Sequence, residues 1–496
     1  MAAHRTVLAG AAALGLTLGA LVAVTPAAAA GSAPVPAHDA GSALWHADAW
    51  SNAGGSGLTA TDIGTAYSAQ AGGADGTGVG IALIDTGVVN VPGLPAAQIV
   101  NGPDLSFESQ SNNLRYLDTF GHGTHLAGIM VGSDPATGFR GIAPKAKLTS
   151  IKVGASGGAV DVSQVIAAID WAVEHRGDDP ANPIRVINLA YGTDGTQITL
   201  YDPLNYAVEN AWRNGIVVVA AGGNAGATAS LTNPAYDPFV LAVGSNSVNN
   251  TVAATDDTAS SFNSRSTSRN IDLTAPGEQI VSLRDPGSYL DTTYPGARVG
   301  DAYFRGSGTS QASAVATGAV ALLLQKRPTL TPDQVKAVLK ATATPIAGGA
   351  GELNLAAAVK AATPSTAQTG TPSAGVGSLE TARGTNHVVH DNQPLIGEYD
   401  IFGPFNPAVW AQTTRGGNAW VGGVWMGRRM AGDGWTGTSW ASKTWAAATW
   451  SGQSWAAEAW YDDTWSGHYW SGGSWTGHYW SGHYWSSSSW SAQRWT

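Results

Sequence analysis

The chain has 496 residues, of which 43% are hydrophobic and 12% charged, and a formal net charge of −10. This composition supports a large buried core. The acidic balance argues against nucleic acid or an anionic membrane as the main partner, because neither attracts an acidic surface. Cysteine is absent, so stability must come from core size, bound ions or compact loops. We expect one large domain with appendages, as a monomer.

Residues 1–30 have the pattern of a secretory signal peptide. His4 and Arg5 precede an apolar run from Val7 to Val24, and three alanines end the segment at Ala30. We therefore expect export by the general route, cleavage after Ala30 and a secreted, extracellular protein. An uncleaved membrane anchor is the alternative. It is disfavoured because the apolar run is short and no basic stop signal follows it.

Residues 31–59 form a short N-terminal segment, and residues 60–362 alternate apolar runs with amphipathic stretches. The apolar runs suit strands buried on both faces, at residues 79–85, 146–153, 184–192, 215–223 and 239–245. Helical periodicity covers residues 122–131, 162–175, 203–214 and 310–326, and a last helix begins after Thr331. This alternation predicts a doubly wound α/β domain, with a mostly parallel sheet, helices on both faces and sites at the carboxyl ends of the strands.

Beyond this domain the composition changes twice. Residues 363–384 are rich in Ser, Thr, Gly and Pro and are predicted to form a flexible linker. Residues 385–496 form a tryptophan-repeat region, because 16 of the 20 tryptophans lie in residues 410–496. From Trp435 to Trp495, every fifth residue is a tryptophan. A period of five keeps successive tryptophans off a common helical face, which favours short hairpins or solenoid sides over a helix. A disordered segment that binds other surfaces non-specifically is the other interpretation.

Three glycine-rich segments carry residues for nucleophilic catalysis: IALIDTG, GHGTHLAG and RGSGTSQAS. Asp85 ends an apolar strand, His122 begins a helix between two glycines, and Ser310 opens a helix of small residues. A serine hydroxyl becomes nucleophilic when an imidazole takes its proton and a carboxylate orients that imidazole. Asn224 follows a buried strand, and its side-chain amide and the Ser310 backbone N–H are the candidate oxyanion hole.

The motifs DTG, HGTH-x-AG and GTS-x-AS, in this order, resemble those of the subtilisin-like serine endopeptidases over about residues 60–362. GIAP at residues 141–144, LTAPG at 273–277 and the closing GELNLAAAV agree. The resemblance implies a catalytic triad of Asp85, His122 and Ser310, with Asn224 as the oxyanion donor. It also implies polypeptide substrates and no cofactor required for the chemistry. Three positions depart from the family pattern: Ala314 replaces a usual Pro, Gln311 a frequent Met, and Ala190-Tyr191-Gly192 the common SLG.

The same resemblance suggests how substrate binds. An extended peptide would pair with two exposed edges, and alternate side chains would enter pockets. The edges would be Gly158, Ala159 and Val160 on one side and Ala190, Tyr191 and Gly192 on the other. Gly222 and Gly223 would line the primary pocket, whose small walls favour a bulky apolar residue before the cleaved bond.

Other motifs have simpler interpretations. GADGTGVG precedes its strand, which disfavours a dinucleotide site. His125 is expected to be structural, because no HExxH pattern accompanies it, and Asp118 to be solvated or to cap a helix. Structural Ca²⁺ is possible but not assignable, because the segment after the His122 helix is short. Residues 177–182 and the pair Asp256–Asp257 are expected to form solvated surface.

Two functions remain in competition. The first is a secreted serine endopeptidase acting through an acyl-enzyme. The second is an adhesion or glycan-binding protein in which the tryptophan repeats contact sugar rings, such as cell-wall glycan, and the peptidase domain is vestigial. The presence of all three triad residues favours the enzyme. Residues 31–59 are too short for the folded propeptide of the family, so the enzyme folds unaided or with help from the tail.

Overall fold

The computed structural model describes residues 49–50, 58–106, 108–109, 114–249, 251, 254–265, 269–365, 367–390, 393–401, 403–421 and 423–427. The predicted signal peptide, most of the short N-terminal segment and the tryptophan repeats after residue 427 lie outside these ranges. Within them, no helix combines the length and apolar character needed to cross a membrane.

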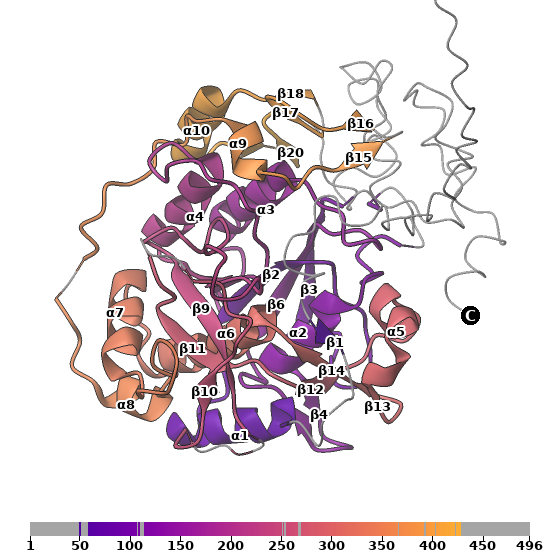
Figure 1. The fold of residues 1–496 in the computed structure, drawn as a ribbon, viewed down its shortest axis with the longest axis vertical. Coiled ribbons are helices and arrows are strands. Elements are labelled where there is room, and N and C mark those ends of the chain that lie inside the picture. The colour runs from indigo at the N-terminus through magenta and orange to yellow at the C-terminus, as the bar shows by residue number, and fades with distance from the viewer. Residues whose placement is uncertain are drawn as a thin grey trace, which may run out of the picture. The chain divides into compact units, whose positions relative to one another are not determined.

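A sheet of eight strands forms the centre of the described residues, in the order β10-β9-β8-β7-β2-β6-β3, with β11 beside β9 (Figure 1). Apart from the antiparallel pair β9–β10, neighbouring strands run parallel. The strands are β2 Gly80–Asp85, β3 Ile99–Asp104, β6 Lys147–Lys152, β7 Ile184–Leu189, β8 Val217–Ala221, β9 Leu241–Ser247, β10 Thr258–Ala259 and β11 Leu273–Pro276. The predicted α/β class is confirmed.

Helices cover both faces of this sheet. On one face α2 (His122–Val131) packs against α6 (Thr309–Lys326), and on the other α3 (Val162–Glu174) packs against α4 (Pro203–Arg213). The predicted starts are accurate because capping residues fix them: Asp161 caps α3, Asp202 caps α4, and Thr331 forms a capping box at α7. The other helices up to residue 362 are α1 Ala60–Gln70, α5 Tyr289–Thr293, the 3₁₀ turn η1 Pro295–Ala297, α7 Pro332–Thr342 and α8 Leu355–Lys360.

The strand order places Asp85 at a switch point of the sheet. From β2 the chain fills one side with β3 and β6, then crosses through α3 to fill the other side with β7, β8 and β9. The switch point therefore lies between β2 and β7, and the carboxyl ends of the strands at such a point are where doubly wound proteins place their ligands.

A smaller sheet leads into α6. It contains β12 (Ile280–Leu283), β13 (Arg298–Val299) and β14 (Tyr303–Ser307), and β1 (Ala49–Trp50) pairs antiparallel with β14. A hairpin of β4 (Ser133–Asp134) and β5 (Phe139–Arg140) follows α2. These strands are too short to produce a clear periodicity, which is why only the long strands are predictable from the sequence.

The end of the predicted linker is folded instead of flexible. Residues 379–383 form α9 (Leu379–Arg383), capped by Ser378, and the side chains of Leu379 and Arg383 are fully buried. This helix is anchored against α3 and α4 by the buried side chains of Leu379, Ala382 and Arg383, although the surrounding composition is that of a linker.

The first tryptophans of the repeat region also belong to the folded core. Trp410 and Trp425 donate indole N–H hydrogen bonds to the buried Asp170 carboxylate of α3, at 2.8 and 2.9 Å. The Trp420 indole donates to the Ala167 carbonyl at 2.9 Å. Trp420 and Trp425 are cross-strand partners in the antiparallel pair β19–β20. The elements here are β15 Val389–His390, β16 Gln393–Pro394, β17 Tyr399–Asp400, β18 Gly403–Pro404, α10 Pro407–Arg415, β19 Trp420–Val421 and β20 Val424–Trp425.

Candidate active site

Asp85 and His122 form a direct hydrogen bond at the switch point. Nδ1 of His122 lies 2.7 Å from Oδ1 of Asp85, and both side chains are almost completely buried. The Thr86 backbone N–H also donates to Oδ1 of Asp85, at 2.8 Å. Because the surroundings exclude water, this bond is stronger than it would be at a surface. It leaves Nε2 of the imidazole as the nitrogen that can accept a proton.

Two features fix the His122 backbone. Gly123 allows the start of α2 to approach β2 closely, since a Cβ at this position would lie 2.1 Å from the Gly87 carbonyl oxygen. The buried Asp118 carboxylate accepts the Gly121 and Thr124 backbone N–H groups, each at 2.7 Å. Asp118 therefore caps the start of α2, one of the two roles that the sequence allowed.

Asn224 lies against the start of α6. Its Oδ1 accepts the Thr309 backbone N–H at 2.8 Å and the Thr309 hydroxyl at 2.9 Å, and the Gly223 N–H donates to that hydroxyl at 3.1 Å. Ser310 follows Thr309 in the first turn of α6, where backbone N–H groups have no helical acceptor.

The two predicted substrate edges differ from expectation in their exposure. Ala159, Val160, Ala190 and Tyr191 are all buried, whereas the sequence predicted open edges. Part of this burial comes from a segment far along the chain. Asp161 and Thr193, which directly follow the two edges, contact residues 378–386, and the sequence had assigned those residues to a linker and a separate tail.

Trp50 is a residue of the site that no motif indicated. Its ring meets the His122 ring edge-on, with centroids 6.2 Å apart and planes at 83°, and the His125 ring at 5.2 Å. It reaches this position because β1 pairs with β14, directly before α6. A tryptophan in a Gly-, Ala- and Ser-rich segment gives no sequence signal for such a contact.

Lys152 and Glu108 form a second unpredicted element, an ion pair of 3.1 Å with both side chains about 1% exposed. The Lys152 ammonium also donates to the Thr86 and Gly154 carbonyl oxygens, each at 2.7 Å. Glu108 accepts the Ser156 backbone N–H at 2.9 Å. The pair thus links the loop after Asp85 to the segment that leads into the first predicted substrate edge.

His125 is buried beside Trp50. Burial is the main cause that lowers the pKa of His125 to about 3, and the neighbouring His122 adds to the effect. The His125 ring is therefore neutral at ordinary pH. Among the described residues there is no group of three or more His, Cys, Asp or Glu side chains suited to a metal ion.

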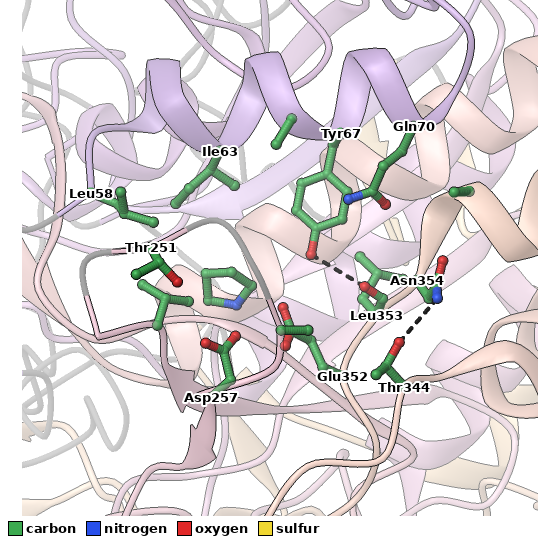
Figure 2. Close-up of a pocket in the computed structure, with 15 residues that line it drawn as sticks. Leu58, Ile63, Tyr67, Gln70, Thr251, Asp257, Thr344, Glu352, Leu353 and Asn354 are labelled. Carbon is green, nitrogen blue, oxygen red and sulfur yellow. Dashed lines mark hydrogen bonds between the residues drawn. The ribbon is translucent and has the colours of Figure 1, made fainter.

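Asp257 departs from the predicted solvated surface, because it is only 5% exposed. It lines a cavity of about 260 Å³ between α1 and the segment from Thr344 to Ala356, together with Glu352 (Figure 2). Figure 2 shows the two carboxyl groups on the same side of the cavity, below Tyr67. Burial and the nearby Asp257 raise the pKa of Glu352 to about 9, so Glu352 is protonated at neutral pH. No triad residue lines this cavity.

The raised pKa of Glu352 predicts a pH dependence of stability. In the unfolded chain Glu352 titrates near 4.5, so between about pH 4.5 and pH 9 the folded state binds more protons than the unfolded state. The contribution of Glu352 to the stability of the folded state therefore decreases as the pH rises through this window. We expect Glu352→Gln to flatten this loss and to be more stable than the wild type at pH 8–9, measured by urea unfolding. Glu278→Gln, at a half-buried position, is the control, and equal pH slopes in wild type and Glu352→Gln would refute the assignment.

The described residues thus combine a mostly parallel α/β sheet, a buried Asp–His hydrogen bond at its switch point and a neighbouring helix whose second residue is Ser310, which are components that a serine hydrolase uses. The chain belongs to the subtilase family: the model of that family matches residues 76–378, more than half of the sequence.

Curated relatives agree with this membership. Serine protease AprX of Bacillus subtilis (strain 168) is 38% identical over 275 residues, which cover 53% of this chain and 61% of AprX. The chain therefore spans less than two thirds of that relative. Subtilisin DY of Bacillus licheniformis is 33% identical over 302 residues, covering 59% of this chain and 94% of the relative. Among solved structures, fervidolysin from Fervidobacterium pennivorans, described as a keratinolytic enzyme related to subtilisin, is 27% identical with a TM-score of 0.47, covering 60% of this chain and 44% of fervidolysin.

Proposed function

We propose that this chain is a secreted serine endopeptidase that hydrolyses peptide bonds through an Asp85–His122–Ser310 triad and an acyl-enzyme. The observation that carries the proposal is the 2.7 Å hydrogen bond between His122 and Asp85, at the carboxyl end of β2, where doubly wound proteins place their ligands. The anchoring of Asn224 on Thr309, one residue before Ser310, supports the position of the oxyanion hole.

In the proposed mechanism Asp85 holds the His122 imidazole with Nδ1 protonated, so that Nε2 takes the proton from the Ser310 hydroxyl. The Ser310 oxygen bonds to the scissile carbonyl carbon, and the carbonyl oxygen becomes an oxyanion facing the Asn224 amide and the Ser310 N–H. His122 then gives its proton to the leaving amine as the C–N bond breaks. Water, activated by the same imidazole, releases the acyl group and regenerates the serine.

The decisive test is covalent labelling. A fluorophosphonate reacts with an activated serine, so the peptide containing Ser310 should carry the phosphonyl group in a peptide-mass map. Labelling of a different serine, or of none while denatured protein is still cleaved, would contradict the assignment of Ser310. We also propose that the protein is a monomer and that the chemistry requires no cofactor. The substrate edges and the Gly222–Gly223 pocket are proposed as the sequence assigns them.

Secretion is proposed on the pattern of residues 1–30. Contact with cell-wall glycan is a further proposal, and it concerns the tryptophans after residue 427. Trp410, Trp420 and Trp425 are buried, and an indole face that packs inside the protein is not available to a sugar ring. We expect purified cell wall to retain the full chain better than a variant with alanine at the tryptophans from Trp435 to Trp495. Equal retention of the two proteins would count against glycan contact.

A further inference from the structure

The C-terminal part of the chain touches the ends of both proposed substrate edges. Arg383, the last residue of α9, pairs with Asp161, which directly follows Val160. The Thr193 hydroxyl, directly after Gly192, donates to the Ala382 carbonyl oxygen at 2.6 Å. Figure 1 shows α9 beside the starts of α3 and α4, on the same side of the sheet. One short helix thus joins two segments that are about 30 residues apart in sequence.

The Asp161–Arg383 ion pair is fully buried. Nε of Arg383 lies 2.6 Å from Oδ2 of Asp161, and neither side chain is exposed. The rest of the guanidinium is held by its own segment: it donates to the Gly397 carbonyl at 2.8 Å, to the Glu380 carboxylate at 3.1 Å and to the Tyr399 carbonyl. A planar guanidinium with all these acceptors has one orientation, so it fixes the position of the Asp161 carboxylate.

Asp161 transmits this position to the first edge and to α3. Its Oδ1 accepts the Ser163 N–H at 3.0 Å, and its own N–H donates to the Gln164 side chain at 2.7 Å, which completes a capping box. The backbone from Val160 into α3 therefore depends on where the Asp161 carboxylate is held.

The second edge is fixed by the residues that directly follow α9. The Thr385 N–H and the Asn386 side chain both donate to Oδ1 of Asp194, at 2.7 and 2.9 Å. Gly384 permits this contact, because its φ is +65° and a Cβ there would lie 2.1 Å from the Asp194 carboxylate. Tyr191 of this edge lies within the field of the ion pair: after burial, the Asp161 charge raises the pKa of Tyr191 and Arg383 opposes it.

We propose that Arg383 is a positioning residue for substrate binding, which holds the two edges at the spacing that an extended peptide requires. The inference rests on the proposed function, because it uses the edges assigned there. Arg383 touches no substrate and acts through Asp161, while its helix holds Thr193 and Asp194. The C-terminal part of the chain is accordingly a component of the binding site for several substrate residues on the acyl side of the cleaved bond.

The test compares substrates of different length in the full protein. In Arg383→Met we expect KM for a tetrapeptide anilide to rise about 10-fold, while kcat changes by less than about two-fold. A single-residue ester uses the nucleophile and the primary pocket but not the edges, so its kinetics should change by less than about two-fold. All rates are expressed per active site, titrated with a fluorophosphonate, so that misfolded protein does not contribute.

Two further variants complete the experiment. Arg415→Met removes an exposed arginine from α10 and should leave both substrates unaffected. Arg383→Lys keeps the charge but loses the planar fork, and we expect an intermediate KM for the tetrapeptide; it replaces Arg383→Met if that variant does not fold. Equal losses for tetrapeptide and ester, or a loss confined to the number of titratable sites, would show a purely structural role and overturn the proposal. A wild-type protein without a titratable serine would instead refute the proposed function.

Discussion

Ser310→Ala is expected to lose about 10⁶-fold in kcat toward peptide substrates, the size found when the nucleophile of a subtilisin is removed. Alanine removes the oxygen that we propose forms the acyl-enzyme and should keep α6 intact, because the side chain at this buried position becomes smaller by one oxygen. The residual rate should come from the oxyanion hole and from substrate positioning, which act on water directly.

The measurement is hydrolysis of a peptide anilide together with fluorophosphonate labelling, and both should disappear in Ser310→Ala. Ser68→Ala is the matched control, because it removes a buried serine hydroxyl of α1 that bonds only to the Ala74 carbonyl in the described structure. This control should keep wild-type kcat. If Ser310→Ala kept a substantial fraction of the activity, the nucleophile would have to be another residue.

Asn224→Ala is expected to lose about 10²- to 10³-fold in kcat with little change in KM, the size measured for the corresponding donor in a subtilisin. The reason is that, in the proposed mechanism, the Asn224 amide donates to the oxyanion, which exists in the transition state and not in the bound substrate. An interaction made only in the transition state lowers kcat and kcat/KM equally.

Asn224 also accepts two hydrogen bonds from Thr309, so its removal needs a control for that contact. Thr309→Val deletes the hydroxyl that bonds to Asn224 and keeps the backbone N–H that does the same. It should therefore cost much less than Asn224→Ala. A rise in KM at constant kcat in Asn224→Ala would show that Asn224 binds substrate and transition state equally.

The parts of the fold that were predictable from sequence are those with strong local signals. Long apolar strands and capped helices are such signals, and α2 begins at His122 and α7 after Thr331 as predicted. The direct contact of Asp85 with His122 was predictable because a carboxylate at a strand end and a histidine at a helix start are brought together by the parallel topology.

The parts that were not predictable depend on contacts between distant segments. Trp50 reaches His122 only through pairing of a two-residue strand, and Arg383 becomes a buried anchor only because Asp161 lies opposite it. Composition alone suggested a linker around Arg383, since tertiary packing of a few residues leaves no periodic trace. The exposure of the substrate edges could not be predicted for the same reason: their burial depends on how residues far along the chain pack beside them.

The docking of Trp410 and Trp425 on Asp170 bears on where this protein can be shortened. The family match ends at residue 378, which is before α9, α10 and both of these indoles. A truncation at that point would expose the face of α3 that these later segments cover. Asp170 would lose its two indole donors, and Asp161 would lose the positive charge of Arg383. Trimmed versions intended for expression or crystallisation should consequently end no earlier than residue 427, and fusion partners are better attached after that position than in place of the segment before it.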